Sequence, residues 1–221
     1  MYKRLFVLLA IFKNINGVTF KCDFRSQTWY NELHYSYDGM SSNFYECRNT
    51  NGEIKSYDTA VTSIDGNHLN RKGNSDVVSF DTQNHPIHYF PTELNEFFEN
   101  LKSIRIKKSQ LKRLREEDLE PFWDLRLLCL SNNNIERLEG NVFKHNKKLE
   151  YLSLDVNTIH VVDVGTFDHL AVLKSLLFRG NPCHSDLAFY NPKGVIKLAG
   201  VIGDKCKDLT KSIDVRTIYH L

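Results

Sequence analysis

Several common sequence features are scarce in this chain, and each scarcity removes a class of protein. The 221 residues include only 11 glycines and 5 prolines, too few for a collagen-like or low-complexity chain. No apolar run reaches the roughly 20 residues that a membrane-spanning helix needs. The best later run, 194–203, is short and carries Lys197. With 41% hydrophobic and 25% charged residues, the chain is expected to be a soluble, folded protein.

Strong net charge and recognisable catalytic motifs are also missing. The formal charge is +2, which implies no nucleic-acid partner. No glycine-rich loop suited to phosphate occurs, and the nine histidines do not fall into a motif with a nucleophile and an orienting acid. His85 and His88 offer two metal ligands without a visible third. We therefore predict a non-enzymatic protein without a metal site or a cofactor.

The first 17 residues have the order of a secretory signal peptide. A basic start at Lys3 and Arg4 is followed by an apolar run over 5–12 and a small-residue exit at Gly17. We expect cleavage near this glycine, which would leave 26 basic and 27 acidic residues. The mature protein is then expected to be secreted and extracellular. The alternative is an N-terminal strand or a short anchor.

An internal repeat is the strongest pattern in the chain. Four leucines recur at intervals of 24 residues, and each opens a similar phrase of apolar positions, namely Leu101, Leu125, Leu149 and Leu173. In the second phrase the following members are Leu128, Leu130, Asn133, Ile135, Leu138 and Phe143. The fourth repeat is interrupted by Pro182, which directly follows its asparagine, Asn181. The alternative of an amphipathic helical protein does not explain three matching phrases at one period.

The spacing within each phrase predicts a short strand followed by a bend. Apolar residues two apart point to the same side of a strand, so each coil contributes one parallel strand to a sheet. Side chains of Asn133, Asn157 and Asn181 are expected to stack as a ladder that satisfies backbone groups of the bend, with Ser109 as a weaker substitute. A single coil buries too little apolar surface to fold alone, so the array needs neighbours and covered ends.

The segments on both sides of the array are predicted to be caps. Residues 77–100 resemble a degenerate coil, whereas residues 18–76 lack the period and alternate aromatic with polar side chains. We divide the chain into a signal peptide (1–17), an N-terminal cap (18–76), a repeat array (77–181), and a C-terminal cap and tail (182–221). The alternating segment predicts strands that cover the edge of the first coil.

Four of the five cysteines flank the two predicted caps. Cys22 and Cys47 are 25 residues apart, and Cys183 and Cys206 are 23 apart. Local pairing would close each cap, although five cysteines with one left over allow 15 arrangements and position is the only guide. The remaining cysteine, Cys129, falls at the outward position between Leu128 and Leu130. It is either a small shielded apolar residue or an intermolecular or reactive thiol.

At this point the sequence resembles the secreted leucine-rich repeat proteins. The element that opens with Asn181-Pro182-Cys183 is similar in part to their C-terminal caps, which usually carry four cysteines where this chain has two. The N-terminal stretch, with Cys22-Asp23-Phe24 and Tyr45-Glu46-Cys47, is more similar to the cap of short secreted insect members. The resemblance implies an α/β fold, a right-handed solenoid with a parallel concave β-sheet and disulfide-linked N- and C-terminal caps.

Family members of this kind recognise other molecules, usually proteins, through the concave sheet or its rims, and several act in adhesion or innate immunity. The predicted ligand-binding residues occupy the outward positions of the strands: Arg105, Lys107, Leu127, Cys129, Tyr151, Ser153, Asp155, Leu177 and Arg179. Tyr151 and Arg105 are of the types that often anchor a partner. The expected partner is an extracellular protein, and the alternative is a solvated face without one.

Two other functions remain open from the sequence. The chain is either a component of a homo- or hetero-oligomer that assembles through Cys129 or a solenoid edge, or a binder of anionic glycans. The prediction of anionic-glycan binding rests on a basic cluster in the first coil: Lys102, Arg105, Lys107, Lys108, Lys112, Arg113 and Arg115.

Overall fold

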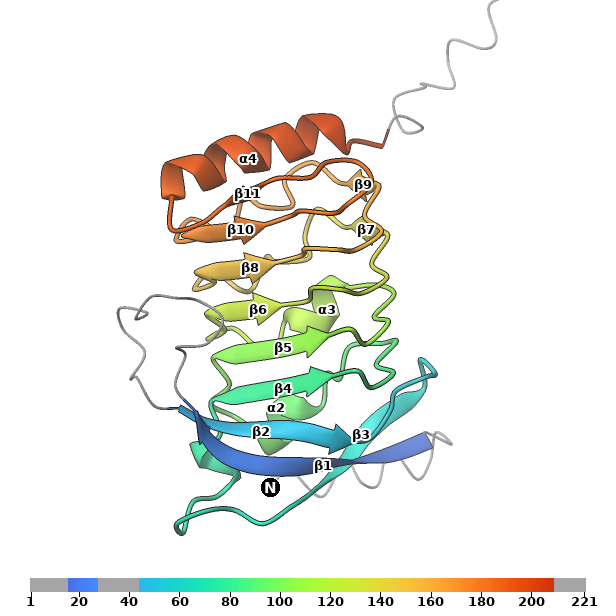
Figure 1. Cartoon of the computed structure of the whole chain (residues 1–221), viewed down its shortest axis with the longest axis vertical. Helices are drawn as coiled ribbons and strands as arrows, with labels where there is room; N and C mark the ends of the chain where they lie inside the picture. Colours follow the sequence, from blue (N-terminus) through green and yellow to red (C-terminus); the bar gives the residue numbers. More distant parts are fainter. Residues whose placement is uncertain (1–15, 28–43, 209–221) are drawn as a thin grey trace, which may run out of the picture.

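A computed structural model describes residues 16–27 and 44–208. Its main feature is a nine-stranded sheet with the order β11-β10-β8-β6-β5-β4-β2-β1-β3. The strands lie above one another like rungs, and the chain passes from the N-terminal strands to helix α4 at the other end (Figure 1). The predicted signal peptide lies outside the described residues except for its last two members, Asn16 and Gly17, which belong to β1.

The repeat forms the centre of this sheet. One parallel strand comes from each coil, and the five strands are β4 (Ser79–Gln83), β5 (Ser103–Lys107), β6 (Leu127–Cys129), β8 (Tyr151–Ser153) and β10 (Ser175–Leu177). Their register pairs each residue with the residue 24 positions later, as in the pairs Ile104↔Leu128 and Leu128↔Leu152. The sequence period is therefore the strand-to-strand step of the solenoid.

The apolar positions of the repeat fill a continuous core. Leu128, Leu130, Leu152 and Leu154 are all fully buried. Between the strands of successive coils lie the short helices α2 (Leu94–Phe97) and α3 (Glu116–Leu119), and a second sheet of β7 (Arg137–Leu138) and β9 (Val161–Val162). The 3-10 helix η2 (Asn74–Asp76) precedes β4.

The asparagine ladder joins successive coils as the spacing predicts. Asn157 donates from Nδ2 to the carbonyl oxygens of Leu130 and Leu154, at 2.9 and 3.0 Å, and its Oδ1 accepts from the Ile135 N–H at 3.1 Å. Asn133 and Asn181 make the same kinds of contact one coil earlier and one coil later. Buried backbone groups of the bends are thereby satisfied.

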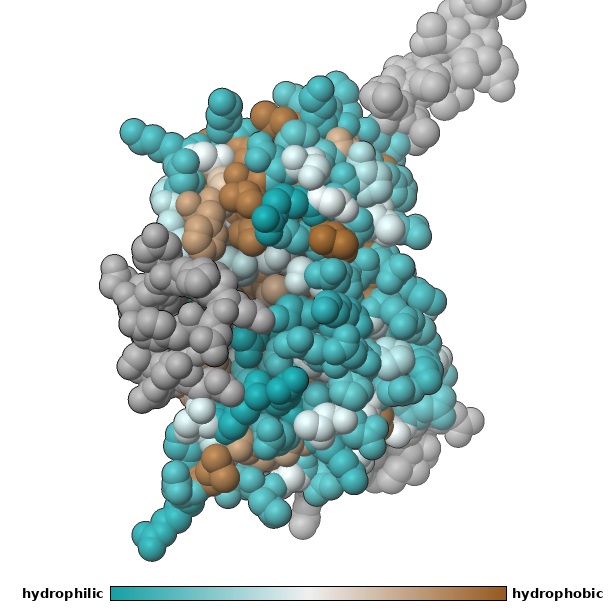
Figure 2. Space-filling model, viewed as in Figure 1, coloured by the Kyte–Doolittle hydropathy of each residue, from teal (hydrophilic) through white to brown (hydrophobic). Residues whose placement is uncertain are grey.

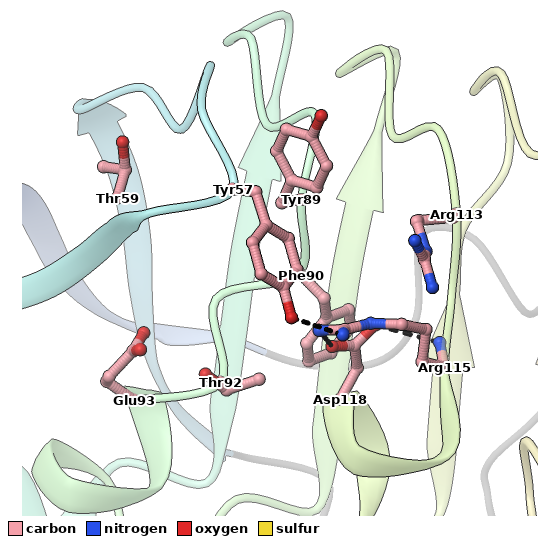
Figure 3. A pocket seen from close by; sticks show the side chains of 9 residues that line it. All are labelled: Tyr57, Thr59, Tyr89, Phe90, Thr92, Glu93, Arg113, Arg115 and Asp118. Atoms are coloured by element: carbon pink, nitrogen blue, oxygen red, sulfur yellow. Dashed lines mark hydrogen bonds and ion pairs between the residues drawn. The ribbon is translucent and has the colours of Figure 1, made fainter. Parts of the chain in front are cut away.

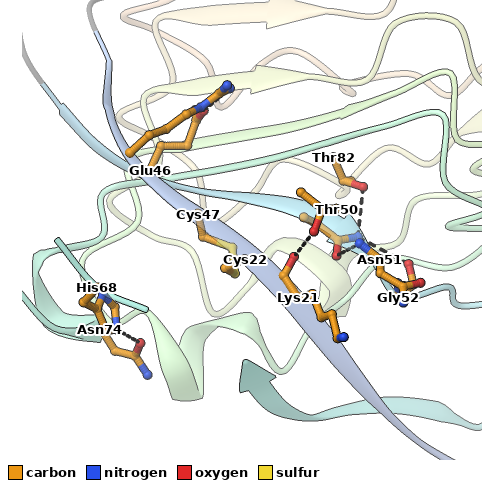
Figure 4. The surroundings of a disulfide bond; sticks show 12 residues. Lys21, Cys22, Glu46, Cys47, Thr50, Asn51, Gly52, His68, Asn74 and Thr82 are labelled. Atoms are coloured by element: carbon orange, nitrogen blue, oxygen red, sulfur yellow. Dashed lines mark hydrogen bonds and ion pairs between the residues drawn. A yellow bond between two sulfur atoms is a disulfide. The ribbon is translucent and has the colours of Figure 1, made fainter. Parts of the chain in front are cut away.

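Three strands form the N-terminal end of the sheet. β1 (Asn16–Gln27) pairs antiparallel with β2 (Phe44–Asn51) and parallel with β3 (Thr59–Asp65), and β2 lies parallel to β4. The Cys22–Cys47 disulfide links β1 to β2 (Figure 4). Phe20 of the cap stacks on Phe80 with ring centroids 5.6 Å apart. The hydrophobic core is therefore continuous between the cap and the coil of residues 77–100.

The C-terminal end is covered by a short strand and a helix. β11 (Leu187–Ala188) pairs antiparallel with β10, and α4 (Pro192–Lys205) packs Val195, Leu198 and Ile202 onto the last coil. The second predicted disulfide, Cys183–Cys206, fixes the end of this helix. Both disulfide-linked caps are thus confirmed. Within the described ranges, no helix is long and apolar enough to cross a bilayer.

Candidate functional site

The outward residues of the parallel strands line up in columns across the concave face. One column contains the paired positions Ser79, Ser103, Leu127, Tyr151 and Ser175, and the next contains Asp81, Arg105, Cys129, Ser153 and Leu177. The intervening residues are buried in the core, as strand alternation requires. The strands therefore place the predicted binding residues on one face, with Asp155 and Arg179 just beyond β8 and β10.

The N-terminal half of this face is a lattice of ion pairs. Two buried acids, Glu46 and Asp81, are 0% and 1% exposed and lie among three arginines. Arg25 NH2 is 2.8 Å from Glu46 Oε1, and Arg105 contacts Glu46 Oε2 while its Nε lies 3.3 Å from Asp81 Oδ1. Arg48 is 3.9 Å from Asp81 and more exposed. A buried carboxylate without such partners would be strongly destabilising.

This lattice changes the interpretation of Arg105. Its side chain is only 13% exposed and spans the two buried acids, so it holds the cap against the first coil. Neither Glu46 nor Asp81 is among the site residues that the sequence predicts. Asp81 lies 24 residues before Arg105, so the repeat period could have placed it next to Arg105 on the neighbouring strand. Glu46 lies in the cap, which has no period, so nothing in the sequence connects it with Arg105.

The C-terminal half of the face is apolar. Leu127, Cys129 and Tyr151 form a buried cluster with Phe44, separate from the main core, and each is 8% exposed or less. Leu177 and Phe189 pack against this cluster and remain partly exposed, and Leu187 is 37% exposed. Brown hydrophobic surface is visible over this end of the sheet, beside hydrophilic surface (Figure 2). The accessible apolar residues are thus Leu177, Leu187 and Phe189 rather than Tyr151.

Cys129 is a free thiol inside this cluster. It is 7% exposed, and its Sγ lies 3.5 Å from Ser131 Oγ. This burial favours the shielded apolar role, because a thiol must be accessible to attack a sulfur of another molecule. Assembly through Cys129 stays a prediction, without support from its environment.

An oriented guanidinium borders the apolar end of the face. Arg179 Nε and NH2 lie 3.1 and 2.6 Å from Asp155 Oδ2, and the Arg179 N–H donates to Asp155 Oδ1 at 2.7 Å. The hydrogen bond and the charge of Asp155 raise the pKa of Arg179 above its ordinary value. The Arg179 side chain remains 56% exposed, so a guanidinium oriented by Asp155 faces solvent beside Leu177.

The basic cluster of the first coil does not form one surface. Arg105 and Lys107 belong to β5 on the concave face, whereas Arg113 and Arg115 line a pocket elsewhere. Arg115 is already paired with Asp118 and Glu117. Anionic-glycan binding by the whole cluster therefore stays a prediction that this division does not favour.

Part of the repeat matches a known family, and parts of the chain are similar to known proteins. Residues 124–182 match the family model described as leucine rich repeat. The high affinity nerve growth factor receptor of Gallus gallus is 33% identical over 72 residues, which cover 33% of this chain and 9% of the receptor. A chain in the structure of the Toll–Spätzle complex, titled a molecular hub in Drosophila development and innate immunity, aligns with a TM-score of 0.46 and 19% identity.

That alignment covers 55% of the present chain and 17% of the solved one. The present chain thus spans a small part of either protein. The matched repeat residues and the stacked parallel strands identify the fold as a leucine-rich repeat solenoid with disulfide-linked caps.

Proposed function

We propose that this chain is a secreted, non-enzymatic recognition module that binds an extracellular protein through its concave face. The observation that carries the proposal is the accessible apolar surface of Leu177, Leu187 and Phe189 next to the oriented charge of Arg179. Exposed apolar surface bordered by polar residues is typical of protein interaction sites, and arginine is enriched among the residues that dominate interface energies. Two disulfides fit an extracellular location.

The size of the face limits the kind of complex. Five strands about 4.8 Å apart, with two or three outward residues on each, offer at most roughly 300–400 Å², compared with about 800 Å² per partner in a standard interface, and most of these outward side chains are buried. A stable complex therefore needs contacts beyond the sheet, at a rim or a cap. We further propose that such a complex acts in innate immunity or adhesion, a role that the sequence resemblance to secreted insect proteins supports.

A pair of variants tests the face. Leu187 pairs with Leu177 in the sheet, so Leu187→Asp puts a charge on the concave side, whereas Val164→Asp makes the same change at an 88% exposed position away from that sheet. Proteins captured from extracellular fluid by the wild-type chain should be retained by the Val164 variant. The Leu187 variant should bind them about 30-fold more weakly, the size of a hot-spot loss. Equal retention by both variants would place the binding surface elsewhere.

A further inference from the structure

A pocket lies off the concave face, between the N-terminal cap and the coils of residues 77–100 and 101–124. Its volume is about 190 Å³, and Figure 3 shows the side chains that line it. They come from the cap, from the segment between β4 and α2, from the segment between β5 and α3, and from α3 itself: Tyr57, Thr59, Tyr89, Phe90, Thr92, Glu93, Arg113, Arg115 and Asp118.

The backbone holds the cap side of this pocket in place. Ile54 donates its N–H to the Pro86 carbonyl at 2.8 Å, and His88 donates to the Ile54 carbonyl at 2.7 Å. These bonds tie the segment before Tyr57 to the coil that carries Tyr89, and the two rings meet edge to face with centroids 5.7 Å apart. The aromatic wall is therefore built by two different parts of the chain.

One of the two arginines is part of the structure of the wall. Arg115 NH2 donates to Asp118 Oδ1 at 2.9 Å, and its guanidinium lies 4.7 Å from the Tyr57 ring centroid. Burial acts to lower the pKa of Arg115, but the hydrogen bond and charge of Asp118 outweigh it and raise that pKa above its ordinary value. Arg115 and Asp118 neutralise each other and keep Tyr57 in position.

The other two charged groups are available. Arg113 is exposed and forms no hydrogen bond or ion pair through its side chain with any described residue. Glu93 accepts one hydrogen bond, from the Val61 N–H to Oε2 at 3.3 Å, and has no cationic partner within the described ranges. Tyr57 lies between these two side chains in Figure 3. The pocket thus presents a positive and a negative group on opposite sides of an aromatic ring.

From this arrangement we infer that the pocket binds an extended peptide segment of a partner protein that carries an acidic and a basic residue on the same side of its backbone. Side chains at positions i and i+2 of an extended chain point the same way. The acidic one pairs with Arg113 and the basic one with Glu93, while the backbone between them crosses Tyr57. This site is separate from the concave face and does not depend on the proposed function.

Size and charge select this ligand over two others. Pockets for small molecules usually enclose about 300–1,000 Å³, so a smaller hollow accommodates side chains rather than a cofactor. The lining contains two arginines and two acids, and this balance does not attract a polyanion such as a sulfated glycan. A segment with both charges complements both available groups.

Three acetylated and amidated pentapeptides test the inference: Gly-Glu-Ala-Lys-Gly, Gly-Glu-Ala-Glu-Gly and Gly-Lys-Ala-Lys-Gly. Binding is followed through the amide NMR shifts of Thr92 and Arg113 in the full chain. The wild-type chain should bind the mixed peptide about threefold more tightly than either other peptide, as expected for one exposed ion pair. Arg113→Glu should shift the preference to the double-lysine peptide, and Glu93→Lys to the double-glutamate peptide.

Two further variants make the result decisive. Lys112→Glu changes the charge of an exposed neighbour outside the pocket by the same amount as Arg113→Glu, so it should leave the order of preference unchanged. Glu93→Gln keeps an acceptor for the Val61 N–H and should remove the preference for the mixed peptide without affecting folding. An unchanged order in the Arg113 and Glu93 variants, or an equal change with Lys112→Glu, overturns the proposal. Leu187→Asp should not alter peptide binding, which separates failure of this site from failure of the concave face.

Discussion

At the scale of single residues, one turn position repeats with an unusual backbone conformation. In five successive coils, the residue at the turn after the strand has a positive φ. These residues are spaced 24 apart: Asn84, Lys108, Asn132, Val156 and Gly180. Glycine and asparagine tolerate this left-handed region, but a β-branched residue is strained there. Val156, with φ of 54° and 51% exposure, is therefore the least suitable occupant of a position that the fold requires in every coil.

Replacing this valine should stabilise the protein. Val156→Asn is expected to raise the free energy of unfolding by about 1 kcal/mol, because the left-handed conformation costs a typical non-glycine residue roughly 1–2 kcal/mol. Urea denaturation measures the change. Thr158→Asn, at an exposed position with φ outside this region, serves as the control and should not stabilise. A lower free energy of unfolding for Val156→Asn would show that contacts of the valine side chain stabilise the protein by more than its backbone strain costs.

Arg105 is a predicted binding residue, but its ion pairs with Glu46 and Asp81 give it a role in stability. Arg105→Ala would leave Glu46 and Asp81 with fewer compensating charges, and we expect a loss of about 3 kcal/mol, as when a buried ion pair is broken. Arg48→Ala removes a side chain that is 44% exposed and should cost less than about 1 kcal/mol. Comparable losses in thermal or urea unfolding would contradict the role assigned to Arg105.

At the scale of the coils, neighbouring elements depend on the asparagine ladder. Asn157→Ala would leave the carbonyl groups of Leu130 and Leu154 and the N–H of Ile135 without their side-chain partner. Each buried group left unsatisfied costs about 1–3 kcal/mol, so a total loss of roughly 3 kcal/mol is expected after partial relaxation. The exposed Asn134→Ala, one coil earlier, should change the stability by less than about 0.5 kcal/mol. Similar urea midpoints for the two variants would contradict a structural role for the ladder.

At the scale of the whole molecule, the sequence predicted the repeated contacts and missed the unrepeated ones. The period placed Leu128, Leu152 and Asn157 correctly because every coil repeats the same strand and bend. Arg105 also pairs with Glu46, and Tyr151 also shares a cluster with Phe44; both of these residues lie in the N-terminal cap, where no periodic signal points to them. Fold and cap disulfides were therefore predictable, whereas the accessible part of the concave face was not.

The domain boundaries and the binding residues stay predictions. The pocket beside Tyr57 also had no sequence signal, because its two sides come from segments with different patterns. Arg113 and Arg115 were noticed only as members of a charged run, although one is paired and the other is available. Side-chain pairing, rather than residue type, separates the structural arginine from the candidate contact.

The strand register has a consequence for how such a chain changes length. Because the strands of the repeat pair with one another at the same 24-residue step, removal or duplication of one complete period leaves the surviving strand pairs of the repeat aligned. A change by any other number of residues would displace asparagines from the bends and leucines from the interior. Natural variants of this molecule should therefore grow or shrink in whole turns, while both sealed ends stay as they are.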